Sequence, residues 1–174
     1  MLQDKASLYE LRDRYPEALA VLDFTLSRHP ESSDIMREKA FVLLRLGRPK
    51  EAAVLATAAY AAHPNRWGRA ELLAAVKYEL ADYAAAEQFA QMAITKMNKT
   101  NLRDPNSGTV RLTLIAAAAH IHDEAVKNAA LSDLTTAVPE LTSLGAIRKW
   151  MSPQSNLYHY EPLLDGLRLA GLHD

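Results

Sequence analysis

The sequence contains no cysteine among its 174 residues, which excludes disulfide bonds, a thiolate nucleophile and cysteine-based metal sites. It has only six glycines, and it lacks both a glycine-rich phosphate loop and a Gly-x-Ser-x-Gly elbow. Nucleotide-binding enzymes and serine hydrolases depend on those motifs. We therefore predict that the chain is not an enzyme and that it binds no cofactor.

Long apolar runs and charge clusters are also missing. Stretches such as Leu114–Ala119 are far shorter than the ~20 residues needed to cross a bilayer, and the N-terminus lacks the basic-then-apolar order of a signal peptide. Twenty basic and twenty-one acidic residues give a formal charge of -1, with no lysine or arginine run that would bind phosphates. These absences predict a soluble cytoplasmic protein without a membrane or nucleic-acid partner.

The chain does contain an internal repeat. The segment RYPEALAVLDFTLSRHP (residues 14–30) returns after 34 residues as RPKEAAVLATAAYAAHP and again as DYAAAEQFAQMAITKMN from Asp82. Ala18, Ala52 and Ala86 coincide in this alignment. A fixed period of this length is typical of stacked helical repeats.

Each copy is predicted to form a helix, a tight turn and a second helix. In the second copy, apolar residues recur at spacings of three and four on both sides of Gly47, as expected for amphipathic helices. His29 and His63 each precede a proline, which disfavours helix in the residue before it. Their repetition in register favours a role in the turn rather than in catalysis.

These copies resemble the tetratricopeptide repeat (TPR), which implies an all-α solenoid. The resemblance is carried in the second and third copies by residues at the family's characteristic positions, namely Ala40, Gly47, Pro49, Ala52, Ala59 and Pro64, and then Ala74, Ala81, Asp82, Tyr83, Ala86 and Ala93. We expect one domain, residues 1–174, with three clear repeats at about 1–32, 33–66 and 67–98. The first repeat is less regular, since Thr25 stands where alanine is usual.

The period breaks after the third copy. We predict a polar insertion at residues 98–108, a degenerate fourth repeat at 109–139 and a C-terminal cap at 140–174. The cap is expected to contain a helix with a stripe of Leu163, Leu164, Leu167 and Ala170, a first-turn Pro162 and a left-handed Gly171. The ending DGLRLAGL resembles the tail of the repeat region in bacterial class III adenylate cyclases and some winged-helix regulators.

The candidate site follows from the repeat register. The first helix of each pair lines the concave face of such an array, so we expect the side chains of six residues there to form a partner-binding surface: Arg37, Phe41, Arg45, Glu71, Tyr78 and Glu79. The two aromatic rings would anchor a peptide. Arg37 with Glu71, and Arg45 with Glu79, are each 34 residues apart, so these charges either neutralise one another or grip a charged partner.

Other readings remain open. His120 and Glu124 could share a helical face as metal ligands, but no third ligand is evident, so we predict no metal site. Trp67 and Trp150 are expected to pack rather than bind. The predicted function is a non-catalytic scaffold that binds a protein or peptide segment or self-associates as a homodimer. The alternative is the regulatory half of a bacterial signalling protein, either adenylate cyclase-like or a transcription regulator, without its effector domain.

Overall fold

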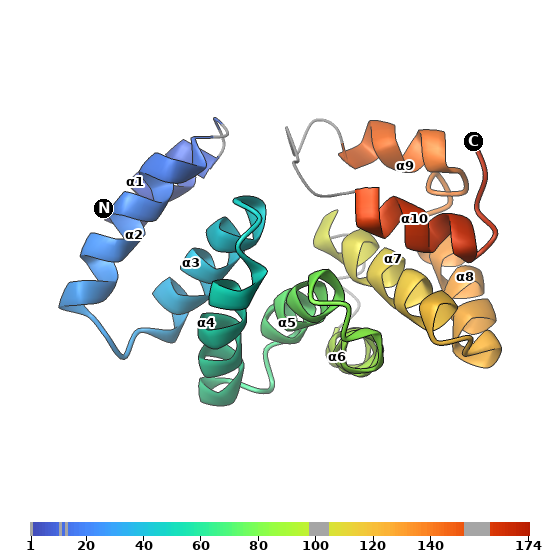
Figure 1. Cartoon of the computed structure of the whole chain (residues 1–174), viewed down its shortest axis with the longest axis horizontal. Helices are drawn as coiled ribbons and strands as arrows, with labels where there is room; N and C mark the ends of the chain where they lie inside the picture. Colours follow the sequence, from blue (N-terminus) through green and yellow to red (C-terminus); the bar gives the residue numbers. More distant parts are fainter. Residues whose placement is uncertain (1, 11, 13, 98–104, 152–160) are drawn as a thin grey trace.

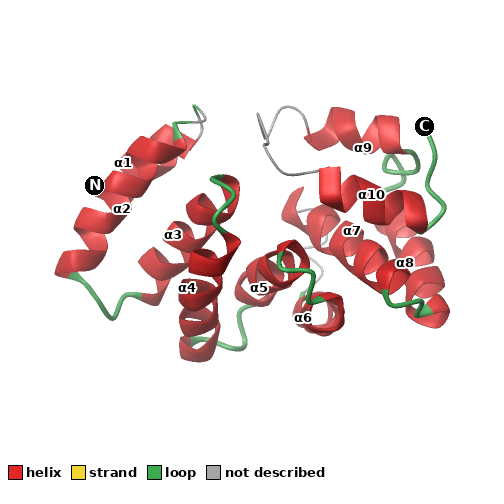
Figure 2. Ribbon diagram, viewed as in Figure 1, coloured by secondary structure: helices red, strands yellow, loops and turns green. Residues whose placement is uncertain are grey.

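The computed structural model of the chain describes residues 2–10, 12, 14–97, 105–151 and 161–174. These residues form a curved row of helices (Figure 1), and no strand occurs among them (Figure 2). The all-α solenoid predicted from the sequence is confirmed. The helices are α1 (Leu2–Glu10), α2 (Tyr15–Arg28), α3 (Ser33–Arg45), α4 (Pro49–Ala62), α5 (Trp67–Glu79), α6 (Tyr83–Lys96), α7 (Pro105–His120), α8 (Glu124–Ala137), α9 (Leu144–Met151) and α10 (Glu161–Leu169).

The first eight helices pair as hairpins: α1 with α2, α3 with α4, α5 with α6, and α7 with α8. Each hairpin packs on the next through its second helix. The first helices α3, α5 and α7 also contact one another in sequence. They therefore form one continuous face of the array, and the second helices lie behind them.

The alanines that define the repeat lie where helices approach most closely. Ala18, Ala52 and Ala86 are fully buried in α2, α4 and α6, and Ala40 and Ala74 are fully buried in α3 and α5. A methyl group at these positions lets the helix axes approach toward about 8 Å. The sequence period is thus a packing requirement, because a larger side chain would force neighbouring helices apart.

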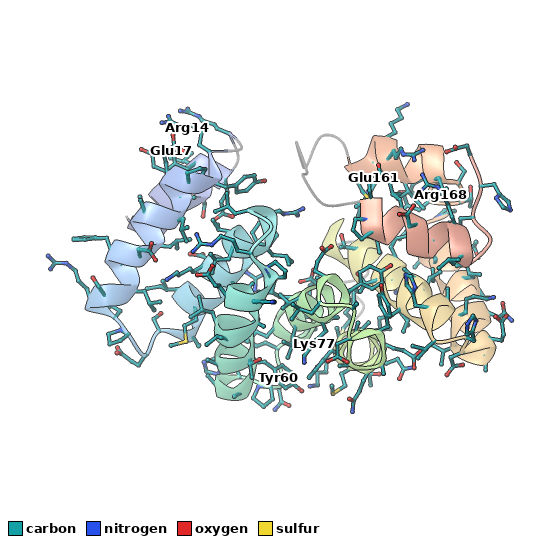
Figure 3. The ribbon with its side chains drawn as sticks, in the orientation of Figure 1. Arg14, Glu17, Tyr60, Lys77, Glu161 and Arg168 are labelled. Atoms are coloured by element: carbon teal, nitrogen blue, oxygen red, sulfur yellow. The ribbon has the colours of Figure 1, made fainter. Side chains whose placement is uncertain are left out.

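The repeat also preserves surface chemistry. Arg14 pairs with Glu17 at the start of α2 (Figure 3), with a distance of 2.7 Å from Nε to Oε1. Arg48 pairs with Glu51 in the same way at the start of α4, at 2.6 Å. Both pairs are exposed, so each contributes little to stability. They show that the second hairpin repeats the first one in side-chain geometry as well as in backbone.

Three hairpins share one turn geometry. A residue in the left-handed region follows the first helix in each: Gly47 (φ 68°), Ala81 (φ 57°) and His122 (φ 58°). The next amide donates back to the last helical turn, as in a Schellman motif: Arg48 N to Leu43 O at 2.9 Å, Asp82 N to Lys77 O at 3.0 Å, and Asp123 N to Ala118 O at 2.9 Å. The left-handed residues are 34 and then 41 positions apart. The seven extra residues correspond to about two helical turns, so the fourth hairpin keeps the same inward face.

The fourth hairpin begins earlier than predicted. Residues 98–104 of the expected insertion lie outside the described residues, but residues 105–108 form the first turn of α7. Ser107 is buried, and a Cβ added to Gly108 would lie only 3.0 Å from the Trp150 ring. The expectation of a loop up to residue 108 was therefore wrong at its end. The tight contact with Trp150 fits the predicted packing role of this tryptophan.

The C-terminal region contains two helices, α9 and α10, and α10 packs along α7. Leu163, Leu164, Leu167 and Ala170 are all buried in α10, which confirms the predicted apolar stripe. Gly171 has a φ of 93° and ends the helix, also as predicted. Because α6, α8 and α10 surround α7, nearly every residue from Ser107 to Ala119 is buried.

Candidate functional site

A cavity opens on the face formed by the first helices. It contains about 650 Å³ of space including its open mouth. Its walls come from α3, α5 and α7, and the start of α10 closes one end. The lining residues are Phe41, Leu44, Arg45, Glu71, Leu72, Ala75, Tyr78, Glu79, Thr109, Thr113 and Leu163.

Most of the predicted site residues lie together in this cavity. Phe41 and Arg45 line it from α3, and Glu71, Tyr78 and Glu79 line it from α5. These five positions are contributed by two neighbouring repeats, as the 34-residue register predicted. Their role in binding a partner stays a prediction.

Arg37 is not among the residues that line the cavity. A Cβ on Gly68 of α5 would lie 3.8 Å from Arg37 Nη2, and the guanidinium also acts electrostatically on Glu10 of α1. Arg37 therefore lies farther along the same face, where α1, α3 and α5 meet. Whether it is paired with Glu71 stays a prediction.

Phe41 and Arg45 form one wall of the cavity. They are four residues apart on α3, and the Arg45 guanidinium carbon lies 4.6 Å from the centre of the Phe41 ring. Both side chains are half-buried. The cation–π contact holds the arginine over the ring, so Phe41 presents a wall that is partly covered by a charged group.

Tyr78 differs from the exposed anchor that was expected. Only 4% of its surface is exposed, and its hydroxyl donates a hydrogen bond to the Pro162 carbonyl oxygen at 2.9 Å. Its ring meets the Tyr83 ring edge-on, with centroids 5.2 Å apart. Burial raises the pKa of Tyr78 above its ordinary value. The reason is that α10 lies over this end of the groove, so Tyr78 is a fixed floor of the cavity.

His120 completes the aromatic cluster beneath α10. Its ring stacks on Tyr83 at a centroid distance of 3.9 Å and an interplanar angle of 5°. Burial lowers the pKa of His120, and Asp165 opposes that shift. A Cβ at Gly166 would come within 2.7 Å of the Ala116 Cβ and would collide with the Tyr78 hydroxyl. Only glycine lets α10 approach this cluster so closely.

The structure corrects the idea that His120 and Glu124 share a helical face. His120 ends α7, Glu124 begins α8, and the left-handed His122 lies between them. The two side chains therefore belong to different helices. Among the residues that the structure describes, no group of three or more His, Asp or Glu side chains is arranged to hold a metal ion.

Glu79 is the most perturbed charge in the cavity. Burial raises its pKa from an ordinary 4.5 to about 7, and burial is the only cause of the shift. Within the described ranges no ion pair joins Glu79 to Arg45, so the predicted neutralisation of this pair does not occur. Water is excluded from the carboxylate without a compensating cation, which disfavours its charged form.

Sequence reasoning missed five of the lining residues: Leu44, Leu72, Thr109, Thr113 and Leu163. Thr109 and Thr113 carry a usable signal, because they lie 34 residues after Ala75 and Glu79. The period thus continues into α7 at these positions, although we placed a break before them. Leu163 carries no such signal, since the path of the tail back onto the groove is not encoded in the repeat.

Comparison with solved structures identifies the fold. The structure of MamA superposes with a TM-score of 0.67 at 11% identity, covering 95% of this chain and 91% of that one. YrrB, described as a TPR protein with an unusual peptide-binding site, gives 0.66 at 17% identity, covering 97% and 82%. PilF of Pseudomonas aeruginosa gives 0.64 at 17% identity, covering 87% and 64%. The chain has the fold of TPR proteins.

Neither the protein-family models nor the curated protein sequences yield a match to this chain. The similarity to solved structures lies at low identity and therefore concerns the fold alone. The predicted resemblance of the tail to adenylate cyclases and winged-helix regulators stays a prediction, as does cytoplasmic localisation. None of the helices in the described ranges is long and apolar enough to span a bilayer.

Proposed function

We propose that this chain is a non-catalytic scaffold that binds a peptide or protein segment in the cavity on its concave face. The observation that carries the proposal is the convergence of three consecutive first helices, α3, α5 and α7, on one open cavity. Fold alone does not assign a function, so the proposal rests on this site. A concave site with apolar walls and few polar groups is the usual form of a binding pocket.

The walls support binding of a side chain rather than chemistry on a substrate. Leu44, Leu72, Ala75 and Leu163 form apolar surface, and apolar area buried by a ligand contributes about 25 cal/mol per Å². Tyr78 is held by its hydrogen bond to α10, so this part of the wall is already ordered before a ligand arrives. A preordered wall lowers the entropic cost of binding.

The test is selection of short random peptides on the immobilised protein, followed by affinity measurement of the selected peptides. Ala75→Arg should abolish their binding, because Ala75 lines the cavity and a long side chain there would fill it. Gln88→Arg is the matched control, since Gln88 is exposed on α6, away from the first helices. Circular dichroism should show both variants to be folded.

The proposal is wrong if the selected peptides bind Ala75→Arg as tightly as the wild type. It is also wrong if Gln88→Arg loses the peptides and Ala75→Arg keeps them, because the site would then lie on the second helices. A failure to select any peptide would count against peptide binding by this face.

A further inference from the structure

The polar groups around the cavity differ in what they offer a ligand. The Tyr78 hydroxyl already donates to Pro162, and the Thr113 hydroxyl donates to the Thr109 carbonyl oxygen at 3.0 Å. Each oxygen therefore retains acceptor capacity after its proton is used. Glu79 adds a carboxylate, which is an acceptor only when ionised. The wall formed by α5 and α7 thus lacks hydrogen-bond donors and needs one from the ligand.

We propose that the cavity selects a partner segment by a cationic side chain, lysine or arginine, whose charged head pairs with Glu79 while its methylene stem and a neighbouring apolar residue cover Leu72 and Ala75. This inference rests on the proposed function, because it names the chemistry of the segment that the concave face binds. Lysine and arginine suit the site because both carry an apolar stem beneath a charged, donor-rich head.

Charge complementarity supports a basic partner over an acidic one. The cavity is lined by two carboxylates, Glu71 and Glu79, and one guanidinium, Arg45. Farther along the same face, the carboxylate of Glu10 interacts electrostatically with Glu38, Arg37 and Arg45. The face therefore carries four carboxylates against two guanidinium groups, and this excess favours a cationic segment and disfavours an acidic one.

The position of Glu79 further favours a cation over a neutral donor. Arg45, the guanidinium in the cavity, is held over Phe41 on the opposite wall and does not contribute to the electrostatics of Glu79. No residue of α7 or α10 that lines the cavity is charged. A cation entering here would therefore meet a partly desolvated carboxylate with no competing cation, the condition in which a charge-assisted hydrogen bond is strong.

The test uses a positional-scanning library of N-acetylated, C-amidated short peptides, in which each pool fixes one residue at one position. Lysine, arginine, norleucine and glutamate pools are compared on the wild type, on Glu79→Gln and on Glu31→Gln. Norleucine keeps the apolar stem and removes the charge. Glu31 is the matched control because it is exposed and lies in the turn between α2 and α3, outside the cavity.

In the wild type and in Glu31→Gln, the lysine or arginine pool should bind about tenfold more tightly than the norleucine pool at one position at least. In Glu79→Gln this preference should fall to about threefold or less, while the norleucine pool keeps its affinity. Retained norleucine binding also shows that the variant is folded and that its groove is intact.

Three results would overturn the inference. Equal binding of the norleucine pool in the wild type would show that no cation is read. An unchanged lysine or arginine preference in Glu79→Gln would place the cation elsewhere. A preference for the glutamate pool would reverse the sign of the partner. In these cases the proposed function survives, whereas absence of binding by every pool would overturn both proposals.

Discussion

The two ends of the concave face differ in how they are covered. At the C-terminal end, α7 is enclosed by α6, α8 and α10, and its residues are buried almost all round. In the middle of the array, α3 keeps half-buried side chains such as Phe41 and Arg45 on its inward face. The repeats present the same face in both regions, so the difference comes from α10. The cavity lies where this helix stops.

The capping helix therefore has two structural roles. It covers the last first-helix of the array, which a solenoid requires at its end. It also supplies Leu163 as a wall of the cavity and fixes Tyr78 through the Pro162 carbonyl. Stability of the closed end and geometry of the open site are coupled through this one helix.

The largest expected effect tests the closed end. Leu167 on α10 is fully buried, whereas Leu169 is 62% exposed on the same helix. Leu167→Ala should lower the free energy of unfolding by about 2 to 5 kcal/mol through lost transfer energy and the cavity left behind. Leu169→Ala should change it by less than about 0.5 kcal/mol. Urea denaturation measures both, and equal losses would mean that α10 does not cover α7.

The second prediction tests what holds the middle of the array together. The buried guanidinium of Arg69 donates to the Ser33 carbonyl oxygen at 2.9 Å and to Asp34 at 2.8 Å, joining α5 to α3. Arg66 approaches the same Asp34 at 3.8 Å, but its side chain is 68% exposed. Arg69→Met should cost about 2 to 4 kcal/mol of unfolding free energy, because buried acceptors lose their donor.

Arg66→Met is the matched control, and it should cost less than about 1 kcal/mol since exposed ion pairs contribute little. Thermal denaturation of the two variants would contradict the assignment if Arg66→Met lost as much stability as Arg69→Met. In that event the long-range charge of Asp34, rather than the buried contacts of Arg69, would join the helices.

The fold was predictable from the sequence as far as the 34-residue period reached. Alanines at fixed spacing and turn residues such as Gly47 encode local geometry that each repeat carries within itself. The start of α7 was not predictable, because Pro105 and Gly108 read as turn formers. Proline is equally suited to the first turn of a helix, and Gly108 is required by contact with Trp150, a residue distant in the sequence.

The site was predictable in its positions and not in its exposure. The register placed Phe41 and Glu79 on one face, and both line the cavity. It could not show that Tyr78 is buried, because the helix that covers it is separated from it by more than 80 residues, with a sequence separation of 84 to Pro162. The register gives the face on which a residue lies, and only tertiary packing decides what covers that face.

The third prediction uses pH to test the open end. The pKa of Glu79 is about 7 in the folded protein against an ordinary 4.5, so the folded state holds this proton more tightly than the unfolded state. The stabilisation is complete below about pH 4.5 and is lost as the pH rises through about 7.

Glu79→Gln removes this loss, because the amide stays neutral. At about pH 8 the variant should be more stable than the wild type by about 1 to 2 kcal/mol, allowing for solvent screening of a partly exposed group. Near pH 4.5, where the ordinary pKa lies, the two should be about equal. Glu10 has a similarly raised pKa of about 7, but it is present in both proteins and cancels in the difference. A difference independent of pH would contradict the assigned titration.

The smallest effect tests the turn geometry that the two regions share. Ala81 has a φ of 57°, whereas the equivalent residue of the preceding hairpin is Gly47 with a φ of 68°. The left-handed conformation costs an alanine roughly 1 kcal/mol and costs glycine almost nothing. Ala81→Gly should therefore raise the free energy of unfolding by about 0.5 kcal/mol, after the greater freedom of glycine in the unfolded chain is subtracted, and Gly47→Ala should lower it by about 1 kcal/mol. Midpoints of urea denaturation, compared at equal m-values, measure both changes. Because the hydrogen bonds of the two turns match, the effects should have opposite signs, and a loss of stability in both variants would show that the third hairpin turns differently from the second.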